Sequence, residues 1–262
     1  MTIALIDGDI VAYRIGFSVQ KKGELIENAE EEAILRCDTT MHAILAETGA
    51  DHFRVFLSGG DNYRLIYNPE YKANRDPADK PILLALVREH LVTNWNAEVQ
   101  DGIEADDAMG IAQWEAARDD LEGSVYVWDR QTVICSIDKD LHQIPGHHYN
   151  FVKQEHSFVD PFDGLKFFYK QLLIGDTVDN IFGVHGIGKV KAARLIDNCE
   201  DELEMFENVQ AQYDSDARLI MNGICLKIQT YPNELWEPPP GAQIETNQIG
   251  EDEGTVPLQE ST

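Results

Sequence analysis

Apolar runs that end in acidic residues constrain the fold of this chain more than any other feature. The run at 3–6 leads directly into Asp7, and the β-branched run at 132–137 leads into Asp138 and Asp140. Runs of this kind are typical of strands that are buried on both faces. Because segments with helical periodicity separate them, the sequence predicts an α/β fold with a mostly parallel central sheet. A functional site is then expected beyond the carboxyl ends of the strands.

The remaining periodicity divides the chain into three parts. We expect a further strand at 54–57, a strand or hairpin at 125–128, and helices at 10–17, 31–47, 81–92, 104–118, 167–174, 189–198 and 216–228. These elements predict an α/β core over residues 1–160 and a helical subdomain over residues 161–232. Residues 233–262 are acidic and carry no Lys or Arg. Their few apolar side chains cannot offset the entropy of ordering, which predicts a disordered tail.

Charge and cysteine content restrict the possible functions. The formal net charge of −26 argues against general nucleic-acid binding, which needs clustered Lys and Arg. Basic residues nevertheless group at 64–75 and 189–194. The four cysteines are scattered and form no CxxC pair, so neither a disulfide framework nor a zinc site is indicated. With no signal peptide and no long apolar run in the sequence, we expect a soluble cytoplasmic protein.

Eight carboxylates in four groups are candidate metal ligands. They are Asp7; Glu104, Asp106 and Asp107; Asp138 and Asp140; and Asp176 and Asp179. Two unpaired carboxylates about 4 Å apart repel by roughly 4 kcal/mol at an effective dielectric constant near 20. A solvated acidic surface explains any one pair, but three of the groups follow apolar strands or open apolar helices. Oxygen ligands favour Mg²⁺ or Mn²⁺ over zinc, and such sites support two-metal phosphoryl transfer.

A glycine-rich loop follows the last of these acidic groups. The sequence GVHGIGK at 183–189 matches the start of a P-loop, but Val190 stands where a P-loop carries the Ser or Thr that binds Mg²⁺. The glycines instead predict a loop whose backbone approaches a phosphate chain, with added charge from the helix that follows. The predicted phosphate-binding residues are Gly183, Gly186, Gly188, Lys189, Lys191 and Arg194.

Two other functions fit part of the sequence. Asp7-Gly-Asp9-Ile-Val11 resembles the nucleophile motif of haloacid-dehalogenase-like phosphatases, with Asp176 in a later acidic motif. That hypothesis leaves Glu104–Asp107 and the glycine loop unexplained. The second alternative is a catalytically weak, structure-specific DNA-binding protein.

Taken in order, five segments resemble the 5′-nuclease family: flap endonucleases, phage 5′→3′ exonucleases and the nuclease domain of bacterial DNA polymerase I. The segments are LIDGD, YRLIYNPEYKANRD, GIEADDAMG, SIDKDL and GDTVDNIFGVHGIGKVKAARLI. The resemblance runs from residue 3 to residue 196 and is closest to the phage exonucleases. It implies a PIN-like core, an arch segment near 61–90 and a helix–three-turn–helix (H3TH) duplex clamp within residues 161–232.

The resemblance also implies roles for particular residues. The eight carboxylates named above become ligands of two Mg²⁺ ions, for which Mn²⁺ can substitute, and a monovalent cation is expected at the H3TH loop. Tyr71, Lys72 and Arg75 lie at the base of the arch as catalytic residues, and Arg64 contacts DNA. The expected partners are DNA with 5′ ends or flaps and the RNA strand of RNA–DNA hybrids. The implied protein is a phage-encoded monomer in the host cytoplasm, without membrane contact.

The chain departs from the family pattern after its second predicted strand. The family carries an aspartate there, but the corresponding place falls near Leu57 or Ser58. Asp61 is the nearest acid, and it follows two glycines that could bend it inward. We expect Asp61 to be a turn residue, which would leave one metal site short of a ligand.

Overall fold

A six-stranded sheet forms the centre of the computed structural model, which describes residues 1–118, 126–128 and 132–244. The strands follow the order β5-β4-β1-β6-β7-β8, and all neighbours are parallel except the β7/β8 pair. Their bounds are β1 (Ile3–Asp7), β4 (His52–Ser58), β5 (Glu98–Gln100), β6 (Thr132–Cys135), β7 (Gly146–Asn150) and β8 (Glu155–Val159). The predicted α/β fold with a mostly parallel sheet is therefore confirmed.

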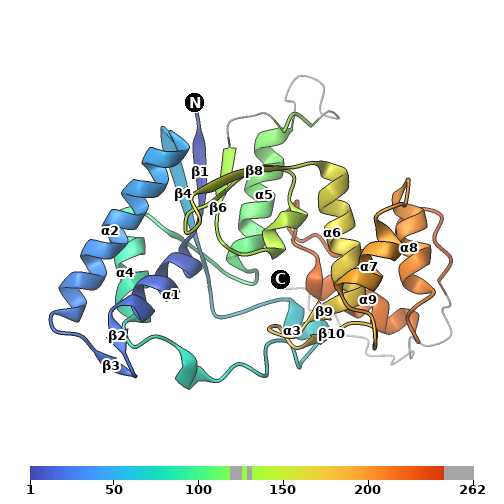
Figure 1. Cartoon of the computed structure of the whole chain (residues 1–262), viewed down its shortest axis with the longest axis horizontal. Coiled ribbons are helices and arrows are strands. Elements are labelled where there is room, and N and C mark those ends of the chain that lie inside the picture. Colours follow the sequence, from blue (N-terminus) through green and yellow to red (C-terminus); the bar gives the residue numbers. More distant parts are fainter. Residues whose placement is uncertain (119–125, 129–131, 245–262) are drawn as a thin grey trace, which may run out of the picture.

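The central strands alternate between two hydrophobic cores, as the period of two along a strand requires. Ala4 and Ile6 face a core shared with three helices, whereas Leu5 faces a second core shared with one helix. The three helices are α1 (Gly8–Ser18), α2 (Ala29–Thr48) and α4 (Leu84–Trp95), and the single helix is α5 (Ala105–Ala117). Figure 1 shows the three helices on the opposite side of the sheet from α5. This arrangement places the N-termini of α1 and α5 near the carboxyl ends of β1 and β6.

A helical region with its own core follows the sheet (Figure 1). It contains α6 (Pro161–Ile174), a short hairpin of β9 (Gly175–Asp176) and β10 (Ile181–Phe182), α7 (Lys189–Ile196), α8 (Glu202–Gln210) and α9 (Asp216–Leu226). Phe168, Leu172, Phe206 and Leu219 are buried in this core. The helix α8 was not predicted, although Leu203, Phe206 and Val209 follow helical spacing in its sequence ELEMFENVQ.

Residues 233–244 correct the prediction that a disordered tail begins at 233. Trp236 is buried against Phe168 and Phe206, and its ring lies where a side chain on Gly223 would have to stand. Trp236, together with the partly buried Ala242 and Ile244, thus anchors a polar segment to the helical core. The remainder of the predicted tail, 245–262, lies outside the described residues.

The segment between β4 and α4 corrects the predicted extent of the arch. It contains only α3 (Arg64–Tyr67) and a turn of 3₁₀-helix, η1 (Pro77–Asp79), before α4 begins at Leu84. Val87 and Leu91 of α4 are buried in the main core. Residues 84–90, which the predicted arch included, therefore lie in a helix that packs on the main core.

Three smaller features complete the description. A hairpin of β2 (Gln20–Lys21) and β3 (Glu24–Leu25) follows α1, and η2 (Asp140–Gln143) follows β6. The strand or hairpin predicted at 125–128 lies partly outside the described residues, and Tyr126 forms an isolated bridge with Arg118. No helix in the described ranges is both long and apolar enough to cross a membrane.

Candidate active site

Asp7 is the last residue of β1 and the N-cap of α1. Its Oδ1 accepts a hydrogen bond from the Ile10 amide at 2.9 Å, and its Oδ2 accepts one from Ser136 Oγ at 2.7 Å. Burial raises the pKa of Asp7 to about 7, although these two hydrogen bonds lower it. The nearby charges of Asp9 and Asp138 add to the rise. Asp7 is thus a buried carboxyl whose ionisation is opposed by other acids.

The N-terminus of α5 brings a second acidic group to the same place. Glu104 is the N-cap of α5, and Asp106 lies in the first turn. Burial, followed by the charges of Asp7, Asp138 and Glu104, raises the pKa of Asp106 well above its usual value. Carboxylates from β1, from α5 and from the loop after β6 therefore converge, as the sequence predicted for strand ends of one sheet.

A third and a fourth group adjoin this cluster. Asp140 begins η2, and burial together with Asp138 raises its pKa to about 6. Asp176 lies on β9, where its Oδ1 accepts hydrogen bonds from the Val178 and Asp179 amides. Lys139 bridges these groups, with its Nζ 3.0 Å from Asp140 Oδ1 and 3.3 Å from Asp176 Oδ2.

Residues 71–75, in the segment after α3, also contact the acidic cluster. The Tyr71 hydroxyl lies 2.9 Å from Glu104 Oε2 and 3.0 Å from Asp179 Oδ2, and Lys72 forms ion pairs with the same two carboxylates. Arg75 also pairs with Asp179. The Lys72 amide donates to the Asp179 carbonyl at 2.9 Å, which ties this segment to the β9/β10 hairpin. The three predicted catalytic residues thus touch the acidic cluster directly.

Arg64 and Asp107 differ from their predicted roles. Arg64 is 2% exposed, and its guanidinium forms two hydrogen bonds with the Asp107 carboxylate. Burial alone would raise the pKa of Asp107, but Arg64 and the amides of Gln229 and Glu104 hold it below its usual value. Neither side chain is free for DNA or metal in this arrangement, because each is already satisfied inside the protein.

Side chains that the sequence did not single out position the acids. Ser136 Oγ donates to Asp7 and accepts from the Asp138 amide at 3.0 Å. Ser58 Oγ accepts from the Ala105 amide at the start of α5, and the Ser58 amide donates to Asp9 Oδ2 at 2.8 Å. Ser136 lies two residues before Asp138, and this position is the one signal in the sequence that could have indicated its role. The hydrogen bonds of Ser58 with Ala105 and Asp9 join residues far apart in the sequence, so no local pattern predicts them.

The glycine loop and α7 lie on the helical region. Lys189, Lys191 and Arg194 are exposed on α7. Gly186 has a φ of +75° and open space around it, whereas a side chain on Gly183 would meet the backbone of Ile174 at 2.3 Å. Gly183 is therefore required for packing against the end of α6. Asp61 lies exposed in the loop after β4.

The donor set fits divalent cations, although the described side chains do not yet surround one. In the described ranges, no three carboxylate, imidazole or thiol groups are placed to hold one ion together. The ammonium groups of Lys72 and Lys139 instead bridge the carboxylates. Burial, and after it repulsion from neighbouring acids, raises the pKa of Asp7, Asp106 and Asp140. All the candidate donors are oxygens, which suits Mg²⁺ or Mn²⁺.

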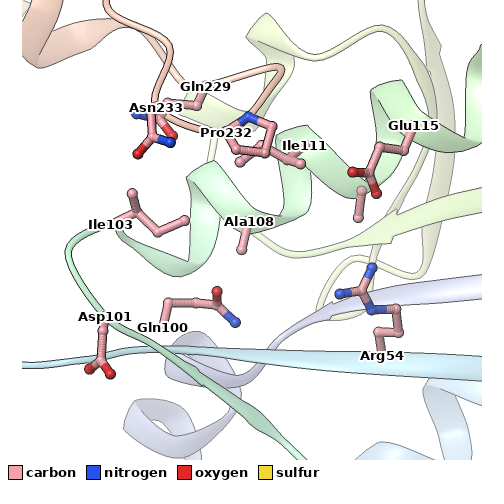
Figure 2. Close-up of a pocket in the computed structure, with 11 residues that line it drawn as sticks. Arg54, Gln100, Asp101, Ile103, Ala108, Ile111, Glu115, Gln229, Pro232 and Asn233 are labelled. Carbon is pink, nitrogen blue, oxygen red and sulfur yellow. The ribbon is translucent and has the colours of Figure 1, made fainter.

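A separate hollow of about 310 Å³ lies between α5, the β4/β5 edge and residues 229–233 (Figure 2). Arg54, Glu115 and Asn233 are among the residues that line it. None of the predicted metal ligands or catalytic residues lines this hollow, so the acidic cluster and the hollow are distinct features.

Comparison with known proteins finds a family model and relatives that match most of this chain. The family model described as 5′-3′ exonuclease, N-terminal resolvase-like domain, matches residues 2–168. DNA polymerase I of Bacillus caldotenax is 29% identical over 235 residues, which are 81% of this chain and 24% of that protein. The 5′-3′ exonuclease of Mycoplasma genitalium is 26% identical over 208 residues, which are 73% of this chain and 70% of that protein. This chain thus spans about a quarter of the length of its polymerase relative.

Solved structures share the fold. The T5 D15 protein co-crystallised with metal ions superposes with a TM-score of 0.67 at 20% identity, covering 88% of this chain and 91% of that one. The bacteriophage T5 D15 flap endonuclease in a pseudo-enzyme-product complex with DNA and metal ions gives 0.65 at 20% identity, covering 88% and 90%.

Proposed function

The chain belongs to the 5′-3′ exonuclease family, and on this premise we propose that it is a metal-dependent nuclease that hydrolyses DNA at 5′ ends or flaps. The observation that carries the proposal is the convergence of Asp7, Asp106 and Asp138 from three separate elements at the end of the sheet, where burial and then the charges of neighbouring acids raise the pKa of Asp7 and Asp106. Uncompensated buried carboxylates at a strand-end site are a mark of a catalytic centre. The phosphatase hypothesis loses its support, because its motif at Asp7 lies within the matched region.

Seven of the eight predicted acids remain candidates to hold two divalent ions. They are Asp7, Glu104, Asp106, Asp138, Asp140, Asp176 and Asp179. Asp107 is set aside because Arg64 and two backbone amides occupy its oxygens. When bound, Mg²⁺ or Mn²⁺ supplies positive charge for the scissile phosphate and lowers the pKa of water.

The roles of Lys72 and Arg75 depend on whether other cations neutralise the carboxylates. Without other cations, Lys72 compensates Glu104 and Asp179, and Arg75 compensates Asp179. Once the carboxylates are neutralised from another source, both side chains become available for the phosphate of a DNA strand. Tyr71 holds the carboxylates of Glu104 and Asp179 close to each other, because its phenolic hydrogen lies within hydrogen-bond distance of both.

The exposed face of α7 is proposed to bind the duplex. Lys189, Lys191 and Arg194 project from a helix whose N-terminus follows the open loop at Gly186 and Gly188. Backbone amides and lysines at such a helix start favour phosphate oxygens. This would make the region from α6 to α9 the predicted H3TH subdomain, which positions the duplex while the acids cut its strand.

A cleavage assay tests the proposal. The purified chain is incubated with DNA carrying a 5′-labelled flap, with a blunt duplex of the same sequence, with the corresponding RNA–DNA hybrid and with p-nitrophenyl phosphate. Short labelled products from the flap in Mg²⁺ or Mn²⁺, none in EDTA, and no p-nitrophenol are expected. Tight flap binding without cleavage in either metal would instead support the DNA-binding alternative, and p-nitrophenol release without DNA cleavage would support a phosphatase.

A further inference from the structure

A chain of two buried glutamines connects the acidic cluster to the backbone that leaves α9. Gln171 of α6 donates from Nε2 to Asp140 Oδ1 at 2.7 Å. Gln143, the last residue of η2, donates from Nε2 to Gln171 Oε1 at 2.7 Å. Both glutamines are 7% exposed. Neither belongs to the motifs that predicted the site, and the proposed chemistry does not use them.

The backbone after α9 fixes the direction of this chain of hydrogen bonds. Gln143 Oε1 accepts from the Ile228 amide at 3.2 Å, and its Nε2 also donates to the Leu226 carbonyl at 2.7 Å. An amide N–H can only donate and a carbonyl can only accept, so Gln143 has one favourable orientation. That orientation turns the oxygen of Gln171 toward Gln143 and its NH₂ group toward Asp140. The carboxylate therefore always faces a donor.

The packing around the two glutamines leaves little freedom to rearrange. A side chain on Gly164 of α6 would meet the Gln143 carbonyl oxygen at 2.6 Å, so α6 and η2 approach as closely as their backbones allow. Asp140 in turn donates from its amide to Asp138 Oδ1 at 2.9 Å. A second candidate ligand, Asp138, is therefore bound to the backbone of the residue that Gln171 contacts.

We propose that Gln171 and Gln143 are positioning residues that orient Asp140 for binding Mg²⁺ or Mn²⁺, with the backbone at Leu226–Ile228 as their fixed anchor. The inference rests on the proposed function, in which Asp140 holds a divalent ion. Partners that hydrogen-bond a ligating carboxylate fix its direction, and their loss typically weakens metal affinity by about 10- to 100-fold. The region from α6 to α9, whose helix α7 is proposed to bind the duplex, thereby also orients the candidate metal ligand Asp140.

Titration of the full chain with Mn²⁺ in the absence of DNA tests this inference, with Mg²⁺ as competitor. Gln171→Met keeps the length of the side chain and removes its hydrogen bonds, and we expect an affinity about tenfold or more below wild type. Gln143→Met does not touch Asp140 but should also weaken binding. Because the two act in series, the double variant should lose less than the product of the single losses.

The matched control is Gln113→Met. Gln113 is an equally buried glutamine, on α5, whose Nε2 donates to the Pro145 carbonyl outside this chain of bonds. It should bind Mn²⁺ like wild type. Asp140→Asn separates the two proposals: if it keeps wild-type affinity, the ligand assignment fails and the inference with it. If Asp140→Asn loses affinity while both glutamine variants match Gln113→Met, the positioning inference alone is overturned.

Discussion

Arg64 and Asp107 form a bidentate ion pair in the interior, with Nη1 2.6 Å from Oδ2 and Nη2 2.8 Å from Oδ1. The same guanidinium donates to the carbonyls of Cys225 and Lys227, and Asp107 Oδ1 accepts from the Gln229 amide. The pair therefore joins the start of α5 to the segment that leaves α9. It secures Glu104 as well, because Asp107 Oδ2 accepts from the Glu104 amide at 3.1 Å.

Breaking this pair is predicted to destabilise the fold. Arg64→Met leaves a buried carboxylate without its partner, which typically costs about 3–5 kcal/mol. Arg54→Met is the matched control, since Arg54 makes an equally bidentate pair with Glu98 at the surface. An exposed pair contributes only about 0–1 kcal/mol. Urea unfolding of both variants measures the difference, and equal losses would show that the buried pair has no special role.

Lys72→Ala is predicted to change metal binding and cleavage in opposite directions. Its ammonium group competes with divalent ions for Glu104 and Asp179, so its removal should tighten Mn²⁺ binding in the absence of DNA. Cleavage should fall because the phosphate loses a cation. Lys166→Ala, which removes a lysine bonded to the Asp197 carbonyl, is the control and should change neither. Weaker Mn²⁺ binding by Lys72→Ala would contradict the competition.

Metal binding is predicted to depend on pH through Asp7 and Asp140. The pKa of Asp7 is raised to about 7 and that of Asp140 to about 6, both above the value of 3.8 for an unperturbed carboxyl. In the metal-free protein, the stability contributed by these groups is present below pH 3.8 and is lost as pH rises through about 6 to 7. Metal binding requires ionised carboxylates and should release protons near pH 6.5.

Thermal unfolding and calorimetry check this pH dependence. The increase in Tm caused by Mg²⁺ should be larger at pH 8 than at pH 6, because a ligand that binds only the folded state stabilises it more when its affinity is higher. Calorimetric titration at pH 6.5 in two buffers of different ionisation enthalpy counts the released protons. A Mg²⁺ effect independent of pH, with no proton release, would show that these acids are already ionised.

The double variant Lys189→Ala and Lys191→Ala is predicted to weaken duplex binding and to reduce its salt dependence. Each lost phosphate contact lowers the slope of log affinity against log salt by roughly one, so a reduction of up to about two is expected. Lys21→Ala with Lys22→Ala removes two exposed lysines at the β2/β3 hairpin, which Figure 1 shows far from α7. If the α7 variant binds duplex with an unchanged slope of log affinity against log salt, α7 does not contact the DNA phosphates.

The sequence predicted those strands and helices whose buried positions recur with a regular local period. Strands such as the one ending at Asp7 and helices such as α5 are visible because buried positions recur at fixed spacing. The acids at their ends were found for the same reason. The pairing of Arg64 with Asp107 was not predicted, since 43 residues separate two side chains that only the folded chain brings together. Trp236 was missed because one aromatic anchor does not change the polar composition of its segment.

The glutamines near Asp140 illustrate the same limit. Gln143 and Gln171 are ordinary polar residues in sequence, and nothing in their spacing indicates burial. Their importance comes from the approach of α6 to η2 and from the path of the backbone after α9. Such contacts depend on tertiary structure, so motif spacing finds the ligands but not the groups that orient them.

The proposed carboxylates are expected to hold divalent ions at the bond that is cut, and the double variant Asp138→Asn with Asp140→Asn removes two of these carboxylates. The purified double variant and the wild-type chain are compared on one 5′-labelled flap substrate, with cleavage measured in Mg²⁺ and binding measured by fluorescence anisotropy in EDTA. We expect the variant to bind the flap about as tightly as wild type and to cut it at least about a hundredfold more slowly. If the folded variant cuts at the wild-type rate, Asp138 and Asp140 do not hold the catalytic ions.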